Sequence, residues 1–535
     1  MRTVRDAAFD VLRRLGGTTL FSNPGSTEIS LLTDLPEDLE FVLALHEGSV
    51  VGMATGWAIA NESPAVVILH TTAGLGNAVG ALATARVNKA PLVVLVGQQD
   101  RRHLAMNPFL AGHRLDELAG DYPVWVNDPA RPQDVPGALA RAWHEATEHG
   151  GPAIVIVPMD DWDAPADEDD AVAAPARVVR ATGVDSAAVD ELVTFLDGAT
   201  APVIVVGAGT DDERSWAALQ VLAGRLQCPV WQEAFGARAG YPQDDPYFAG
   251  HLPSGRSDLR KVLAGRDVIL AVGAPVFRQY PHESGPLVEP GTRIAVITED
   301  PAEANGSPAD LAVVAPPAAV CALLAERLTA RPAPAEDIRR AVEQPGRPAG
   351  DGAMRAPQVF AALAERIPRN TVIVEESPSS RAALHALLPA RVPLGFLSAA
   401  MGGLGFGLPA SIGVKMAQPD RPVVAVIGDG SSMYAIQALW SAARYHTGVL
   451  VVVLSNGRYA IMDRLAQMHG ETTPDGRGSA PWPSFEDLRV SRIADGLGCP
   501  ARRIETYDEL VTALDEIVPT LAERHEPLVL DVAVR

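Results

Sequence analysis

Short, continuous apolar runs alternate along the chain with longer stretches rich in Ala and Leu. Four of the eight runs end in Gly or Asn, and a segment with helical spacing usually follows. Strands buried on both faces of a parallel sheet have this continuous apolar pattern, and helices connect such strands. The pattern therefore predicts repeated strand–helix–strand units. The runs cover residues 64–70, 91–97, 152–158, 201–209, 267–275, 292–298, 422–430 and 448–456.

Two segments interrupt this pattern. Residues 163–181 are acidic and rich in Pro and Ala, and residues 330–355 are rich in Pro and Gly. Neither has apolar periodicity, so both are predicted to be exposed linkers. They divide the chain into three α/β units, at about 1–162, 182–330 and 356–535. We therefore predict three doubly wound α/β domains with parallel sheets.

Composition narrows the class of protein. The 535 residues are 47% apolar and only 5% aromatic, which is typical of a globular chain with a large core. The formal net charge is −22. Such a surface repels phosphate backbones and anionic lipid, so we expect neither a nucleic-acid nor a membrane partner.

Targeting and redox signals are consistent with a cytoplasmic protein. Residues 1–16 predict an amphipathic helix without the apolar centre of a signal peptide. No apolar stretch approaches the roughly 20 residues of a membrane span. Cys228, Cys321 and Cys499 lie far apart and match no metal-binding spacing, which fits a reducing compartment.

Polar residues end two of the apolar runs in the third unit. One run ends in GDGS (428–431) and a later one in SNG (455–457). Ligands bind at the carboxyl ends of strands in open α/β sheets, and glycines let the backbone approach a diphosphate closely. The side-chain oxygens of Asp429 and Asn456 are hard ligands suited to Mg²⁺. GDG alone is a common turn, but the two motifs separated by 26 residues (430–455) are far more specific.

A single carboxylate stands out in the first unit. Residues 41–58, FVLALHEGSVVGMATGWA, place Glu47 between an apolar strand and a helix of small residues. A carboxylate in such surroundings is unusual. An acid that interacts with the dipole at a helix start would be the simpler explanation if the motif stood alone.

At these residues the chain resembles the thiamine-diphosphate enzyme family, whose signature is GDG followed at about this spacing by Asn. The resemblance covers essentially the whole chain and is strongest to the benzoylformate decarboxylase branch of the family. The shared strings are FSNPGSTE (21–28), LALHEGSVVG (43–52), LHTTAGLGNAVGAL (69–82), VGQQ (96–99), DDWD (160–163), GAPVFR (273–278) and GGLGFGLPASIGV (402–414).

The resemblance implies two cofactors, thiamine diphosphate and Mg²⁺. Glu47 would activate the thiamine diphosphate by exchanging a proton with its aminopyrimidine ring. Asp429, Asn456 and the backbone carbonyl of Arg458 would bind the metal. Ser455 stands where the family usually has a first Asn, which leaves the metal-binding position unchanged.

Other cofactor contacts also follow from the resemblance. Leu404 occupies the position of the bulky residue that bends the cofactor, and the Gly402 carbonyl would accept a hydrogen bond from the pyrimidine amino group. The remaining implied contacts are Gly428, Gly430, Ser431, Ser379, Tyr459, Ala460 and Ile461.

Substrate and proton-transfer residues are implied in the same way. Ser26 would bind the substrate carboxylate, and His70 would transfer protons, since an imidazole can change charge near neutral pH. His282 is a further candidate, although it lies about two residues out of register with the family pattern. Ile461 and Leu465 would line the substrate pocket, where they differ from the smaller and aromatic residues of the relative.

The predicted function is non-oxidative decarboxylation of a 2-oxo acid to an aldehyde and CO₂. An aryl 2-oxo acid is the leading substrate, and a smaller or branched aliphatic acid is the alternative. The resemblance places Glu47 against a cofactor held by another subunit, which implies a homo-oligomer, at least a dimer and by family precedent a tetramer.

Three other functions remain open. A carboligase resembling acetolactate synthase would use the same motifs. A dinucleotide-binding oxidoreductase would rest on GAGTDD (207–212) or GLGNAVG (74–80), neither of which is a full GxGxxG. A non-catalytic relative would not need Glu47, Asp429 and Asn456.

Overall fold

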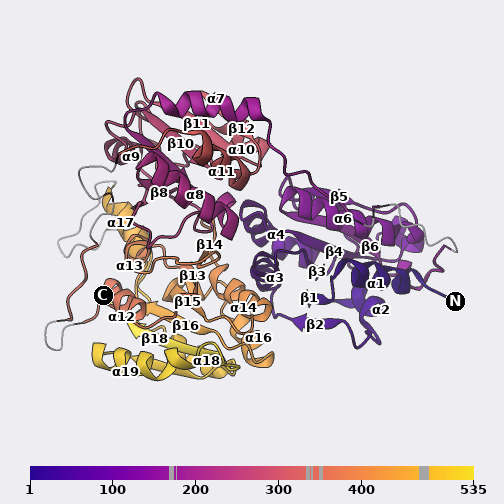
Figure 1. The fold of residues 1–535 in the computed structure, drawn as a ribbon. Helices are drawn as coiled ribbons and strands as arrows, with labels where there is room; N and C mark the ends of the chain where they lie inside the picture. The colour runs from indigo at the N-terminus through magenta and orange to yellow at the C-terminus, as the bar shows by residue number, and fades with distance from the viewer. Residues whose placement is uncertain (168–173, 176, 333–337, 339–341, 349–352, 469–480) are drawn as a thin grey trace.

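Three six-stranded parallel sheets organise the chain into three α/β units (Figure 1). The computed structural model describes all residues except 168–173, 176, 333–337, 339–341, 349–352 and 469–480. The predicted fold class, three α/β domains with parallel sheets, is confirmed. Part of each predicted linker lies outside the described residues.

The first unit is drawn in indigo and violet in Figure 1. Its strands are β1 (Thr19–Asn23), β2 (Glu40–Leu43), β3 (Ala65–Leu69), β4 (Leu92–Gln98), β5 (Trp125–Asn127) and β6 (Pro152–Pro158). Its helices are α1 (Val4–Leu15), α2 (Ile29–Leu32), α3 (Glu47–Asn61), α4 (Thr71–Val87), α5 (Leu115–Leu118) and α6 (Val135–His149). The strand order is β2-β1-β3-β4-β6-β5, and every pair is parallel.

The central unit follows at the top of the view in Figure 1. Its strands are β7 (Pro202–Val206), β8 (Val230–Gln232), β9 (Phe248–His251), β10 (Val268–Val272), β11 (Arg293–Thr298) and β12 (Leu311–Val314). Its helices are α7 (Ser186–Asp197), α8 (Glu213–Leu226), α9 (Arg256–Val262), α10 (Pro301–Gly306) and α11 (Pro317–Arg327). The strand order is β12-β11-β10-β7-β8-β9.

The third unit is drawn in orange and yellow. Its strands are β13 (Val372–Glu376), β14 (Phe396–Ser398), β15 (Val423–Gly428), β16 (Leu450–Ser455), β17 (Ala501–Ile504) and β18 (Leu528–Ala533). Its helices are α12 (Ala356–Ala364), α13 (Arg381–Leu387), α14 (Gly407–Ala417), α15 (Asp429–Ser432), α16 (Ala438–Arg444), α17 (Ala460–Met468), α18 (Val490–Gly496) and α19 (Tyr507–Ile517). The strand order is β14-β13-β15-β16-β18-β17.

The apolar runs in the sequence predicted the inner strands well. Each of the eight runs contains one strand, and these strands are β3, β4, β6, β7, β10, β11, β15 and β16. The predicted N-terminal helix is α1, which begins after a capping box formed by Thr3 and Asp6. The strand assignments and this helix are confirmed.

Helices α3 and α14 pack closely and join the first unit to the third. At Gly56 an added Cβ would collide with the backbone of Ala410, and at Gly413 it would collide with the backbone of Met53. The two glycines therefore allow the helix backbones to approach closely. One hydrophobic core runs through this contact and includes residues of both units, whereas the core around β7 and β10 contains central-unit residues alone.

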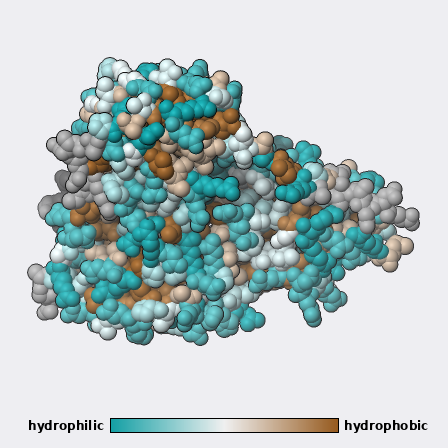
Figure 2. Space-filling view, in the orientation of Figure 1, coloured by the Kyte–Doolittle hydropathy of each residue, from teal (hydrophilic) through white to brown (hydrophobic). Residues whose placement is uncertain are grey.

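Hydrophilic side chains cover most of the face shown in Figure 2, as the acidic composition suggests. Among the described residues, no helix has both the length and the apolar character needed to cross a bilayer. Cys228, Cys321 and Cys499 are buried and form no disulfide, and burial raises the pKa of each thiol to about 12.

Two imidazole rings stack where the central unit meets the third unit. His251 ends β9 and His385 lies on α13, with ring centroids 3.9 Å apart and planes within 14° of parallel. Burial lowers the pKa of His251 to about 3, and burial together with His251 lowers the pKa of His385 well below the usual value. Both rings are therefore neutral in the folded protein at ordinary pH.

This stack predicts a loss of stability in mild acid. Below pH ~6.5 an unfolded histidine binds a proton that the folded His251 does not bind until the pH falls to about 3. Each such group then lowers the free energy of unfolding by about 1.4 kcal/mol for every unit that the pH falls below ~6.5. Between pH 7 and pH 5, we expect the apparent melting temperature of the His251→Phe variant to fall less than that of the wild-type protein.

The exposed His525 offers a matched control. His525→Phe should leave the pH dependence of melting unchanged. Equal pH slopes for His251→Phe and wild type would show that the stacked rings do not govern acid stability.

Candidate active site

Glu47 is the first residue of α3 and lies at the carboxyl edge of the first sheet. It is 8% exposed, and two side-chain amides hold its carboxylate. Nδ2 of Asn23, at the end of β1, donates to Oε1 at 3.2 Å, and Nδ2 of Asn77, on α4, donates to Oε2 at 3.1 Å. The amides orient the carboxyl group without neutralising its charge, which suits a group that exchanges protons.

His70 caps α4 and lies on the same edge of the sheet. Its Nδ1 is 3.1 Å from Oε2 of Glu28 and 2.9 Å from Oγ1 of Thr27. Glu28 is only 2% exposed, and its Oε2 also accepts from the backbone N–H of Gly25 at 2.7 Å. A Cβ on Gly25 would collide with the His70 ring. A carboxylate on Nδ1 fixes the ring and leaves Nε2 available to a ligand.

Ser26 and His282, the other two predicted catalytic residues, lie in different parts of the structure. Ser26 is exposed and begins the short 3₁₀ turn η1 (Ser26–Glu28), whose last residue is the Glu28 that contacts His70. His282 lies in an exposed loop of the central unit after β10. The structure therefore brings Ser26, Glu47 and His70 to one edge of the first unit, and it does not bring His282 there.

Asp429 and Asn456 follow adjacent parallel strands, β15 and β16. Asp429 is 5% exposed, and its Oδ2 accepts from the backbone N–H of Gly457 at 2.8 Å, which draws the two strand ends together. Oδ1 of Asn456 accepts from the backbone N–H of Arg458 at 3.1 Å. Burial raises the pKa of Asp429. A buried carboxylate at one strand end, an amide oxygen at the next and the backbone carbonyl of Arg458 make a donor set of the kind that fits Mg²⁺.

The loop that carries Leu404 is held by a buried carboxylate that the sequence did not single out. Glu376, at the end of β13, accepts from the backbone N–H groups of Gly405, Phe406 and Gly407 at 2.8, 2.7 and 2.6 Å. Burial raises the pKa of Glu376 to about 7 although these three donors oppose the shift. Glu376 thus fixes the turn directly after Leu404.

Helix α17 carries the two residues predicted to line the substrate pocket. Ile461 and Leu465 are half-buried on it. Trp482 folds back onto this helix, since its Nε1 donates to Oδ1 of Asp463 at 2.9 Å and its ring meets the ring of Tyr459 edge-on at 6.3 Å. The orientation of α17 therefore depends on an aromatic residue distant in sequence from the GDG motif.

The predicted residues and the unpredicted side chains that hold them (Asn23, Glu28, Asn77 and Glu376) form two clusters. The N-terminal cluster comprises Asn23, Ser26, Glu28, Glu47, His70 and Asn77, and the C-terminal cluster comprises Glu376, Gly402, Leu404, Asp429 and Asn456. Between the described residues, no hydrogen bond or ion pair of one chain joins the N-terminal cluster to the C-terminal cluster.

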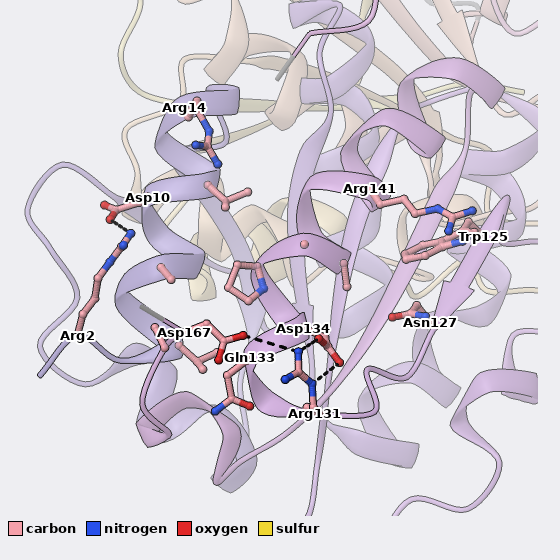
Figure 3. Close-up of a pocket in the computed structure, with 17 residues that line it drawn as sticks. Arg2, Asp10, Arg14, Trp125, Asn127, Arg131, Gln133, Asp134, Arg141 and Asp167 are labelled. Atoms are coloured by element: carbon pink, nitrogen blue, oxygen red, sulfur yellow. Dashed lines mark hydrogen bonds and ion pairs between the residues drawn. The ribbon is translucent and has the colours of Figure 1, made fainter. Parts of the chain in front are cut away.

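A cavity of about 440 Å³ on the first unit lies outside both clusters (Figure 3). Its charged side chains largely pair with one another. Arg2 contacts Asp10 at 2.7 Å, and Arg131 contacts Asp134 at 2.6 Å. It includes none of the predicted site residues, so it is not the candidate active site.

The two glycine motifs considered for dinucleotide binding have other structural roles. GLGNAVG (74–80) lies inside α4. A Cβ on Gly209 would stand 2.9 Å from Cα of Gly273, so the GAGTDD turn is filled by a neighbouring turn. The GAGTDD segment connects β7 to α8, but it is not a full GxGxxG and lacks the open turn that a dinucleotide fingerprint provides.

Family models match three successive parts of the chain. An N-terminal thiamine pyrophosphate (another name for thiamine diphosphate) binding domain matches residues 2–118, a thiamine pyrophosphate enzyme central domain matches 189–324, and a C-terminal thiamine pyrophosphate binding domain matches 379–532. The chain belongs to the thiamine-diphosphate-dependent enzyme family.

Within that family the chain is similar to benzoylformate decarboxylase of Pseudomonas aeruginosa, with 37% identity over 518 residues that cover 96% of each chain. A solved structure of a 4-hydroxybenzoylformate decarboxylase from Rhodococcus jostii RHA1 superposes with a TM-score of 0.92 at 33% identity and covers 100% of this chain and 99% of its own. Acetolactate synthase isozyme 3 large subunit of Escherichia coli is 28% identical over 526 residues, 94% of this chain and 89% of its own.

These comparisons confirm that the chain is an enzyme of the thiamine-diphosphate-dependent decarboxylase family. The match to both cofactor-binding domains supports thiamine diphosphate as its cofactor. The roles of individual site residues stay predictions.

Proposed function

We propose that this protein is a thiamine-diphosphate- and Mg²⁺-dependent decarboxylase of an aryl 2-oxo acid, which it converts to an aldehyde and CO₂. The observation that carries the proposal is the N-terminal cluster, where Glu47 and the Glu28-held His70 share one sheet edge with Ser26. An acid–base pair beside a hydroxyl donor suits proton delivery to a product and binding of a carboxylate.

The C-terminal cluster would hold the cofactor. Asp429, Asn456 and the Arg458 carbonyl would bind Mg²⁺, which would in turn bind the diphosphate. When bound, thiamine diphosphate supplies an electron sink for the loss of CO₂. Leu404, fixed by Glu376, would set the cofactor's shape, and Ser379, Gly428, Gly430, Ser431, Tyr459, Ala460 and Ile461 would complete its contacts.

Each residue of the N-terminal cluster has a separate task in this proposal. The Glu47 carboxyl would exchange a proton with the aminopyrimidine of bound thiamine diphosphate. Ser26 donates a hydrogen bond to the substrate carboxylate, and Nε2 of His70 delivers a proton to the product. His282 would join them only if its loop reached the site from the central unit, and we retain it as a candidate.

An aryl substrate is supported by the names of the relatives that cover nearly the whole chain. Ile461 and Leu465 would form the pocket wall, and Trp482 and Tyr459 would hold that wall in place through α17. A smaller or branched aliphatic acid is the alternative because Ile461 adds bulk to the pocket.

We also propose that the active site forms between two copies of the chain, in a cytoplasmic homo-oligomer. The two clusters of one chain share no hydrogen bond or ion pair among the described residues, although both are needed for one reaction. A second copy would bring its N-terminal cluster to the cofactor held by the first, which requires at least a dimer.

The test is an assay of the holoenzyme with a panel of 2-oxo acids. CO₂ and aldehyde are measured with benzoylformate, 4-hydroxybenzoylformate, pyruvate and a branched aliphatic acid, in the presence of thiamine diphosphate and Mg²⁺. Aldehyde from the aryl acids supports the proposal. Turnover of the aliphatic acids alone would keep the reaction and change the substrate.

The competing function is carboligation of the acetolactate synthase type, which the similarity to that enzyme keeps open. Acetolactate or acetoin from pyruvate, without free aldehyde, would favour it. No turnover of any acid would contradict both functions.

Glu28→Gln tests the His70 assignment. The amide can donate to Nδ1 and so select the other tautomer, which should lower kcat by at least about 100-fold with little change in KM. Glu28→Asp, which keeps the charge, should recover part of the activity. A Glu28→Gln enzyme with normal kcat would show that His70 does not act through this pair.

A further inference from the structure

A cleft of about 660 Å³ lies between the central unit and the third unit. Small-molecule sites usually have volumes of this order. Its central-unit wall comes from the carboxyl ends of β8 and β9 and the start of α9, which is where open α/β sheets bind ligands. Its other wall comes from α13 and from Arg464 on α17.

The cleft is rich in planar side chains. Trp231 and Phe235 line it together with the stacked imidazoles of His251 and His385. Nε2 of His385 is buried and has no hydrogen-bond partner among the described residues. Since buried polar groups are nearly always paired, this nitrogen indicates a place for a ligand atom.

The charged lining favours an anion. Arg464 is exposed, and its one hydrogen bond within the described part of the chain goes from Nη2 to the Ser379 carbonyl at 3.1 Å, so its charge has no carboxylate partner there. Arg381 lines the same cleft and pairs with Glu375 at 2.8 Å. Asp258 is the one acid in the described lining, against these two arginines, in a chain of net charge −22.

We propose that this cleft is a second binding site, separate from the active site, for a small aromatic carboxylate. The rings of Trp231 and Phe235 would take the aromatic part, while Arg464 and the His385 nitrogen would take the carboxylate. Arg464 and Arg381 also bind the segment 375–380, which includes the predicted cofactor contact Ser379. The cleft therefore lies beside the cofactor segment, and Glu47, His70 and Ser26 are not part of its lining.

The test uses 4-fluorobenzoate and fluorine NMR on the holoenzyme. We expect two bound signals per chain, one from the active site and one from the cleft. Arg464→Gln should weaken the second site about tenfold, because a charge-assisted hydrogen bond is lost, and leave the first unchanged. Arg489→Gln is the matched control, since Arg489 is exposed and also donates to backbone carbonyls.

His385→Leu should weaken the cleft signal by a similar factor. If the His385→Leu variant does not fold, Arg464→Gln alone still tests the proposal. The absence of any bound signal that Arg464→Gln or His385→Leu weakens would overturn the proposal, whether or not the active site also binds the probe. The readout is binding alone, so it stands apart from any failure to find a decarboxylase substrate. The natural occupant could be an aryl 2-oxo acid or an aryl carboxylate without the oxo group. Benzoylformate is therefore added to the Glu47→Gln variant, which leaves it intact. Displacement of the cleft signal identifies 2-oxo acids as occupants, and persistence of the signal identifies carboxylates without the oxo group.

Discussion

Replacing Glu47 by Gln is expected to lower the decarboxylation rate by about 1000-fold. The amide keeps the shape of the carboxyl group and its one oxygen can still accept from Asn23 or Asn77, but it cannot take up and release a proton. Binding of thiamine diphosphate should change little, because the C-terminal cluster is untouched. The measurement is CO₂ release at saturating cofactor, beside a titration of cofactor binding.

Glu62→Gln provides the control at the opposite end of the same helix. Glu62 is exposed and follows α3 as its C-cap, so its change should leave the rate unaltered. A Glu47→Gln enzyme within a few-fold of wild type would refute the activating role and leave Glu47 as a helix-start acid.

Asp429→Asn is expected to weaken cofactor binding in the presence of Mg²⁺ by more than about 100-fold. A metal ligand would lose its charge, and that loss should exceed the 10- to 100-fold effects typical of residues that only support ligands. Thiamine diphosphate affinity at several Mg²⁺ concentrations is the direct measurement. The variant should bind equally weakly at all of them.

The same variant has a second readout that needs no cofactor. Burial raises the pKa of Asp429, so the ionised carboxylate costs folding free energy at neutral pH. Without cofactor, Asp429→Asn should therefore melt at the same temperature as wild type or higher. Asp420→Asn, an exposed change just before β15, should alter neither quantity. A destabilised variant that still binds the cofactor and Mg²⁺ normally would contradict the metal assignment.

Eight of the inner strands were predictable because burial on both faces requires unbroken apolar runs, whereas the inner strands β1, β8, β13 and β18 lie outside those runs. Edge strands have no such requirement. β5 is three half-buried residues, and β17 reads ARRI, which carries two arginines. Their place in the sheets comes from tertiary pairing, which a local pattern does not record.

The candidate site was predictable where one residue ends a buried strand, as Asp429, Asn456 and His70 do. The partners that hold such residues were not. Glu28 was within a recognised string without being singled out, since only its contact with His70 reveals its role. Asn23 and Asn77 lie far from Glu47 in sequence, and their amides look like ordinary polar residues until the fold brings them together.

The close contact of α3 with α14 bears on how this chain can be re-engineered. Because the first and third units share one hydrophobic core, a chimera that exchanges either alone must recreate the fit around Gly56 and Gly413. The central unit has a core of its own, but its Trp216 and Ala239 also pack into a core of the third unit, so a graft of the central unit must recreate that smaller contact. In recombination within the family, the two outer units should therefore be exchanged together, and the central unit can be exchanged on its own when its contact with the third unit is kept.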